Sequence, residues 1–218
     1  MEPRPNFTET KIDLATPLSM KSAFRFPLQS AEARKEVLWG AMLLLIPLIG
    51  CLLNMGHRIE MVHRMQHGKS AWPSWGKYNR LFRSGLIVWL GMVCYYAPAM
   101  VLTAAGWRFG NAWVYAAALL AFLLASIAIP GYMTHYCRTY DYREIFNPLR
   151  AFHRIQEGGS AYWKAWGIAL AALSVSLLGL LALGAGFLVT SVWFWQVAGY
   201  SFAAVFSKKF ALTETGTR

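Results

Sequence analysis

The sequence predicts an all-α, polytopic membrane protein with four full spans and one N-terminal re-entrant, or kinked spanning, helix. Of its 218 residues, 56% are hydrophobic and only 14% are charged, whereas soluble domains carry roughly 25% charged residues. Several uncharged stretches reach about 18 residues, the length that a membrane-spanning helix needs. A polar phrase also occurs twice, at His63 and at His153, which indicates a weak internal duplication.

The chain begins with a polar segment, residues 1–29, that contains several prolines and shows no helical period. We expect a flexible tail there. Ser30 is suited to cap the next helix, and Glu32 lies favourably near its positive end. A single helical membrane domain is expected over 30–209, followed by a C-terminal tail at 210–218. Its apolar segments are expected at about 37–55, 85–104, 112–133, 167–182 and 188–206.

The first apolar segment, 37–55, contains Pro47 and Gly50 at its middle, and these residues interrupt helices. Each arm is then too short to cross a bilayer alone. If the segment crosses fully, 14 Lys and Arg lie on one side and 7 on the other; if it dips in and returns, the split is 20 to 1. The positive-inside rule favours the re-entrant form with both termini cytoplasmic. An ordinary kinked span with an exported tail is the alternative.

The last apolar stretch, 165–207, contains no charged residue over 43 positions. As one helix it would reach about 65 Å, roughly twice the thickness of the hydrocarbon core. The stretch must therefore fold back, and Gly184 and Gly186 mark the corner. Two spans result from this one stretch.

The repeated phrase reads "HRMQHGKSAWPSW" at 63–75 and "HRIQEGGSAYWKAW" at 153–166. Each copy is expected to end a helix, turn at its glycine and lead into a span, with Arg64 and Arg154 facing lipid phosphates. The residues expected to face lipid or a partner are His63, Arg64, Gln66, Gly68, Trp72 and Trp75 in the first copy, and His153, Arg154, Gln156, Gly158, Trp163 and Trp166 in the second.

A rival interpretation makes His63, His67 and His153 ligands of a metal or haem. The second copy has Glu157 in place of His67, which weakens that interpretation, so we expect no metal and no cofactor. The three cysteines show no paired spacing and are interpreted as small apolar residues.

The formal net charge of +11 could suggest nucleic acid as a partner. The positive residues lie between the apolar segments, where topology and anionic headgroups require them. We therefore expect membrane lipids as partners, together with other membrane subunits or further copies of the chain, and no nucleic acid. A bacterial inner membrane is the expected location.

The segment 46–86 resembles an uncharacterised prokaryotic membrane family, domain of unknown function 4013. In that family an apolar stretch with a Pro–Gly break precedes a helix with Arg, then Gly, a "P-x-W" phrase and "F-x-x-G". Here Pro73–Trp75, Phe82 and Gly85 match, and 146–163 and 192–206 look like its later segments. The resemblance covers roughly 24–209. It implies a helical membrane fold and transfers no catalytic residue; Gly76 and Lys77 replace the acidic pair often found after "P-x-W".

The expected spans contain no Asp, Glu, Lys or Arg, although membrane catalysis and ion coupling normally need such groups. We therefore expect an accessory or scaffold subunit without a catalytic site of its own, acting in a larger complex or as a homo-oligomer. The alternative is a small transporter or pore with an uncharged path, lined by small residues such as Thr103, Ser176, Gly184 and Gly186. A lipid-modifying enzyme is the weaker third interpretation.

Overall fold

The computed structural model describes residues 14, 17–73, 75–182 and 184–206. These residues form seven α-helices, three short 3-10 helices and no strand, which confirms the all-α prediction. The elements are α1 (Met20–Arg25), η1 (Phe26–Leu28), α2 (Ala31–Leu43), α3 (Ile49–Gln66), α4 (Tyr78–Phe109), α5 (Ala112–Thr139), η2 (Tyr142–Glu144), α6 (Pro148–Leu178), η3 (Gly179–Leu181) and α7 (Ala185–Val205). The expected C-terminal tail, 210–218, lies outside the described residues.

Side-chain caps begin α2, α5 and α6, whereas α3, α4 and α7 have no such cap. The Ser30 hydroxyl accepts a hydrogen bond from the Ala33 amide at 3.0 Å, so Ser30 caps α2 as the sequence predicts. Asn111 and Asn147 cap α5 and α6 in the same way. Gly110 ends α4 in the left-handed conformation, with φ 63°, which costs glycine little.

Four helices are long and apolar enough to cross a membrane by length and composition: α4, α5, α6 together with η3, and α7. The four expected spans are therefore present as helices. They are longer than the apolar segments alone indicate, and α4 has 32 residues, about 48 Å. The extra length is largely polar, and it lies at the start of α4 and α6 and at the end of α5.

A sharp connection joins α2 to α3. The first helix ends at Leu43 and the second begins at Ile49, so Pro47 lies in the connection and Gly50 in the first turn of α3. A Cβ atom on Gly50 would lie 1.8 Å from the Leu43 carbonyl oxygen. The Asn54 side-chain amide donates to the Gly40 and Gly50 carbonyls at 3.0 and 2.9 Å. The two helices therefore form a closed hairpin.

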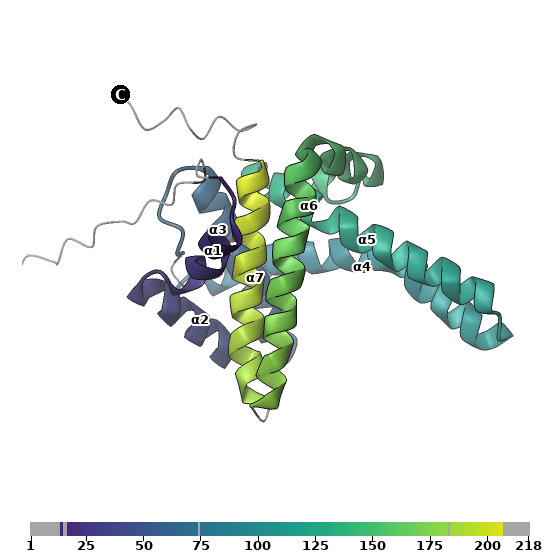
Figure 1. Cartoon of the computed structure of the whole chain (residues 1–218), viewed down its shortest axis with the longest axis horizontal. Helices are drawn as coiled ribbons and strands as arrows, with labels where there is room; N and C mark the ends of the chain where they lie inside the picture. Colours follow the sequence, from purple (N-terminus) through teal and green to yellow (C-terminus); the bar gives the residue numbers. More distant parts are fainter. Residues whose placement is uncertain (1–13, 15–16, 74, 183, 207–218) are drawn as a thin grey trace, which may run out of the picture.

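Two long hairpins point in different directions (Figure 1). In one, α6 and α7 run antiparallel side by side. In the other, α4 and α5 leave the body of the molecule together as an arm. The helices α1–α3 cover α7 on the side away from this arm, and the start of α4 packs against α3.

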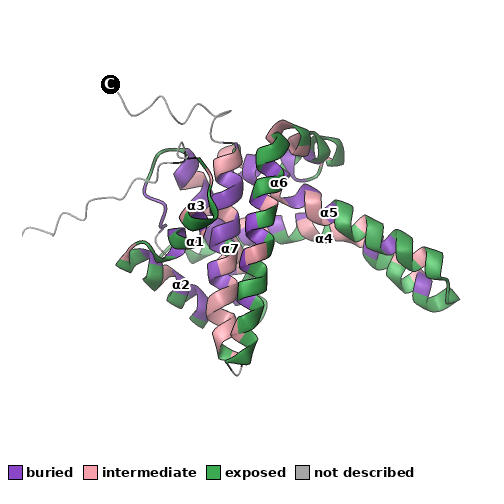
Figure 2. Ribbon diagram, in the orientation of Figure 1, coloured by how far each residue is buried: buried purple, intermediate pink, exposed green. Residues whose placement is uncertain are grey.

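Buried residues gather where α3, α7 and the C-terminal end of α5 meet, whereas the outer part of the arm is largely exposed (Figure 2). At the tip of the arm, Trp107 and Trp113 are each 84% exposed. Such large exposed apolar side chains suit a lipid or protein neighbour rather than water.

The expected flexible tail over 1–29 is corrected for its last part, because residues 20–28 form α1 and η1. Phe26 is 2% exposed and stacks on Tyr200 of α7, with ring centroids 4.7 Å apart. The Trp193 indole donates to the Phe24 carbonyl at 3.3 Å. Aromatic burial against α7 orders a segment that has no helical period of its own.

Candidate functional site

The two copies of the repeated phrase lie on two sides of the C-terminal end of α5. From the first copy, the Gln66 amide donates to the Thr134 carbonyl at 3.1 Å. From the second copy, Glu157 lies 3.3 Å from the His135 ring nitrogen. Elements far apart in the sequence thus meet on one helix, and the structure brings both phrases to one end of the molecule (Figure 1).

The first copy ends α3 and turns at Gly68, which has φ 63°. The Arg64 side chain closes this turn by donating to the Ser70 carbonyl at 2.6 Å. Gln66 is 1% exposed and Trp72 is 6% exposed, and Trp72 stacks on Phe26. The expectation that Gln66 and Trp72 face lipid or a partner is therefore wrong, because both side chains belong to the core.

In the second copy the helix is interrupted by a sharp kink, as predicted, and a second helical part follows it. The backbone of α6 bends at Gly159, with φ 52° and ψ −140°, a conformation that is essentially restricted to glycine. The bend lies one residue beyond Gly158, the expected turn. His153, Gln156 and Trp163 are exposed on this segment, while Trp166 is half-buried.

Arg154 does not face lipid phosphates but is held by two carboxylates. Its guanidinium donates to Glu157 at 2.8 Å and to Glu144 at 3.1 Å. Glu144 is 8% exposed and also receives Arg150 at 3.0 Å. The Arg154 expectation is corrected: an ion-pair network fastens the start of α6 to the connection after α5.

The three histidines of the rival interpretation are engaged in other ways. His63 Nδ1 donates to the Cys137 carbonyl at 2.7 Å, and His67 Nδ1 donates to the His63 carbonyl at 2.7 Å. His153 lies on α6 and pairs with Glu157 at 3.4 Å. Across the part of the chain that the structure describes, no three His, Cys, Asp or Glu side chains are placed to hold a metal ion.

A second polar cluster joins α2, α3 and the loop after α3. His57 Nε2 lies 2.9 Å from a Glu36 carboxylate oxygen, and the same carboxylate accepts the Trp75 indole N–H. The Trp75 ring stacks on His57, with ring centroids 3.9 Å apart. Trp75 therefore covers the buried contact between His57 and Glu36, and this arrangement fixes the loop against the α2–α3 hairpin.

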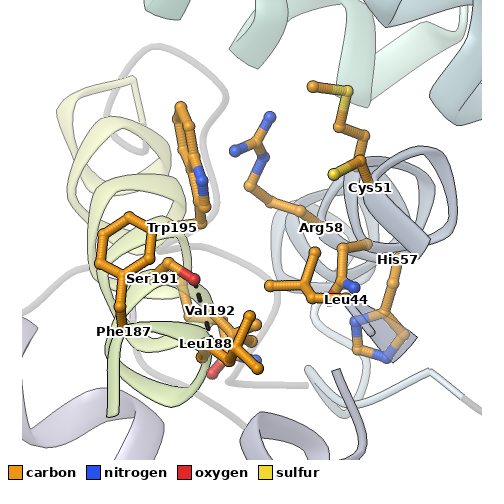
Figure 3. A pocket seen from close by; sticks show the side chains of 12 residues that line it. Leu44, Cys51, His57, Arg58, Phe187, Leu188, Ser191, Val192 and Trp195 are labelled. Atoms are coloured by element: carbon orange, nitrogen blue, oxygen red, sulfur yellow. Dashed lines mark hydrogen bonds between the residues drawn. The ribbon is translucent and has the colours of Figure 1, made fainter. Parts of the chain in front are cut away.

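The next residue, Arg58, points the other way, toward α7. Its guanidinium lies 4.3 Å from the centre of the Trp195 ring, and both side chains line a cavity of about 330 Å³ (Figure 3). Trp195 lies at the middle of α7, a candidate span. The structure thus places a positive charge from outside the spans beside the centre of one of them.

Burial of the Arg58 charge at this position is energetically unfavourable. The residue is 7% exposed, and burying a charge costs several kcal/mol unless it is paired. Among the described residues its hydrogen-bond partner is the Met133 sulfur at 3.8 Å, and no carboxylate lies within ion-pair distance. A desolvated cation–π contact contributes about 2 kcal/mol, less than that cost.

Arg58, His57 and Glu144 are not predicted from the sequence. One signal was present: the pair "HR" occurs at 57–58 as well as at 63–64 within a single helix. Its meaning depends on α7, which approaches from the far end of the chain, so the local pattern alone gives Arg58 no partner.

A family model described as "Protein of unknown function (DUF4013)" matches residues 39–189. The match covers well over half of the chain. The chain belongs to this family. The DUF4013 match is narrower than the expected resemblance over 24–209, and it includes Arg58 and both phrases but not Trp195. No curated protein and no solved structure matches the chain significantly.

Proposed function

We propose that this DUF4013 protein is a membrane subunit without a catalytic site of its own, working as a homo-oligomer or within a larger membrane complex. The arm formed by α4 and α5 carries this proposal. In each arm helix, only 22% of the most apolar 18-residue stretch is buried inside the molecule. The arm contributes little to the protein's own core, so its surface is available to neighbours.

The arm has a groove that suits another helix. It is lined by Tyr96, Ala99, Met100, Thr103, Ala104, Trp107, Tyr115, Ala118, Leu119 and Phe122. Small side chains in its centre let a partner backbone approach closely, and helix association in membranes depends on such packing. The Thr103 hydroxyl already donates to the Ala99 carbonyl at 2.8 Å, so it does not need a hydrogen-bond acceptor from a partner in the groove.

The charge distribution supports a bacterial inner membrane with both termini cytoplasmic. The ends of α3 and α6 that carry the basic phrases lie together (Figure 1). In this arrangement α2 and α3 form a re-entrant hairpin, whose connection exposes Leu45, Ile46 and Leu48 by 66%, 50% and 72%. An apolar tip of this kind suits the hydrocarbon layer.

The alternative, an uncharged transport path, receives less support from the small residues first considered for it. Ser176 is fully buried, and its carbonyl accepts the Thr190 hydroxyl at 2.9 Å. A Cβ atom on Gly186 would lie 2.7 Å from the Gly179 carbonyl oxygen. These residues close the α6–α7 contact by tight packing, which favours the subunit proposal.

Extraction in a mild detergent followed by mass measurement tests the proposal. We expect a particle heavier than one chain, containing several copies or copurifying subunits. Ala104→Trp, which fills the groove, should weaken that assembly at least tenfold, since hot-spot contacts contribute 2 kcal/mol or more.

Val101→Trp is the matched control, because Val101 is exposed on the same helix but does not line the groove. This variant should assemble as the wild type does. A clean wild-type monomer, or equal assembly of the two tryptophan variants, would contradict the proposal.

A further inference from the structure

The cavity between α3 and α7 contains two buried polar groups whose hydrogen-bonding needs are not met. Arg58 offers five N–H donors, and its hydrogen-bond partner among the described residues is a single methionine sulfur at 3.8 Å. Gln196 is 4% exposed, and its side-chain oxygen has no hydrogen-bond partner among the described residues. Both residues line the same cavity. The cavity therefore offers a positive donor and a neutral acceptor together.

The remaining walls of the cavity are mostly apolar, and the cavity opens to the surface. Leu44, Phe187, Leu188 and Val192 line it together with the face of Trp195. Trp195 is 42% exposed and Cys51 is exposed, so the mouth lies between these two residues. A ligand that fits has a polar head for Arg58 and Gln196 and an apolar part that leaves through the mouth.

We propose that this cavity binds the head of an anionic phospholipid that also carries hydroxyl groups. The phosphodiester accepts hydrogen bonds from Arg58, since a guanidinium fork matches phosphate oxygens. A headgroup hydroxyl donates to the Gln196 oxygen. The acyl chains lie along the apolar wall and continue into the membrane. Soluble glycerol phosphate shares the head chemistry, but the apolar walls favour the lipid.

The position of the cavity sets a further condition on the ligand. Arg58 lies eight residues before the end of α3 at Gln66, about 12 Å below the polar end of the molecule. A headgroup held there has left the water. The protein must therefore supply a positive charge for its phosphate and a hydrogen-bond acceptor for its hydroxyl group. A single positive side chain would not do this for a hydroxylated head, whereas Arg58 and Gln196 together do.

The chain provides its own probe and control for binding. Cys51 lines the cavity mouth, whereas Cys94 is exposed on α4 and does not line it. We would measure maleimide labelling of Cys51 in Cys94→Ala protein, and of Cys94 in Cys51→Ala protein, in neutral detergent. Phosphatidylglycerol added to the micelles should slow labelling of Cys51 and leave Cys94 unchanged, and phosphatidylcholine should protect neither cysteine.

Two variants assign the contacts. Arg58→Met keeps the length of the side chain and removes an unpaired buried charge, so its unfolding midpoint in phosphatidylcholine micelles should be unchanged or higher. Its apparent affinity for phosphatidylglycerol should fall at least tenfold. Gln196→Leu should bind phosphatidylglycerol only as tightly as it binds phosphatidic acid, a lipid that lacks the glycerol head. Arg83→Met, an exposed arginine on α4, should match the wild type in each measurement.

Several results would overturn the proposal. Equal protection of Cys51 by phosphatidylcholine, or unchanged phosphatidylglycerol binding by Arg58→Met, would remove the anion site. If Arg58→Met unfolds, Arg58→Gln, which also removes the charge, replaces it, and unchanged binding by that variant counts in the same way. Phosphatidic acid binding as tightly as phosphatidylglycerol would remove the role of Gln196. Full protection by soluble glycerol phosphate would show that no lipid is required.

Discussion

His63, in the first repeated phrase, shows how its neighbours act on a single titratable residue. Burial lowers the pKa of His63 below its ordinary value of 6.5, and the positive neighbours His67 and Lys69 act in the same direction. The Cys137 carbonyl and Glu60 oppose this effect. The Tyr140 ring lies against His63 as well, with ring centroids 4.6 Å apart. The neutral ring, with Nδ1 donating to Cys137, is thus the form that the fold favours.

The stability of the protein should therefore fall as the pH drops below about 6.5. The unfolded chain takes up a proton at the ordinary histidine pKa, whereas the folded chain takes it up only at lower pH, so acid favours unfolding. Thermal unfolding midpoints measured in detergent from pH 7.5 to 5 should show a smaller decrease for His63→Gln than for the wild type. Parallel curves for the wild type and His63→Gln would contradict this account.

Individual residues differ in how far the sequence could place them. Ser30 was predictable as a cap, because its hydroxyl acts on an amide three residues later. Arg154 was not, since its carboxylates include Glu144, which a turn brings back to it. Arg58 was missed for a similar reason: its neighbour Trp195 comes from the other end of the chain. Charged residues are predictable where the contact is local and unpredictable where the contact is tertiary.

At the scale of elements, α3 and α4 approach each other closely through two glycines. A Cβ atom on Gly56 would lie 1.8 Å from the Leu81 carbonyl oxygen, and one on Gly85 would lie 1.9 Å from the Leu52 carbonyl oxygen. Backbone atoms cannot move aside as flexible side chains do. The start of the arm is thus joined to the body of the molecule by direct backbone contact.

Gly56→Ala should destabilise the protein by about 1–3 kcal/mol, the range for forcing extra atoms into a packed core. Gly167→Ala is the control, because a Cβ atom there would meet nothing within 4 Å on the same kind of helix. That change should be neutral or stabilise by roughly 0.5–1 kcal/mol. Thermal or denaturant unfolding in one detergent measures both variants, and equal midpoints for the two would show that α3 and α4 can separate freely.

The sequence predicted the existence of the long helices better than their limits. Uncharged length identified four spans, and Pro47 with Gly50 marked the break after α2. The polar extensions of α4 and α6 were missed, because Tyr78–Ser84 and Pro148–Glu157 become helical through their contacts with α3 and α5. Helix α1 was missed for the same reason, since its ordering depends on α7.

For the molecule as a whole, the proposed re-entrant placement of α2 and α3 would put the N-terminal segment on the cytoplasmic side of the membrane. We expect cysteines introduced at Lys21 and Tyr142 to react with an impermeant maleimide only after the cells are opened. A cysteine at Asn111, in the α4–α5 corner, should react in intact cells. One span, α4, separates it from the N-terminal part of the chain, and three spans separate it from the C-terminal part, so it lies on the opposite side of the membrane from both. These variants need a background in which the native cysteines are alanine.

The Lys21→Cys result separates the two topologies. In the kinked-span alternative the N-terminal segment lies outside, so this cysteine would react in intact cells while Tyr142→Cys would not. Tyr142 is 60% exposed, and Lys21 is also exposed, so a lack of reaction at either site reports the side of the membrane rather than burial. Reaction of Lys21→Cys in intact cells would refute the re-entrant hairpin.

The contact of α1 with α7 has a consequence for how the protein is made. Trp193 and Phe24 are joined across a sequence separation of 169 residues, and Phe26 stacks on Tyr200. During translation the first three helices emerge long before α7 is synthesised. Their apolar faces and Arg58 therefore lack their native contacts during that time. Non-local contacts of this kind form late and slowly. The N-terminal helices therefore reach their native packing only after α7 has been synthesised. A chain that is truncated before α7 leaves these surfaces exposed to insertion factors and proteases.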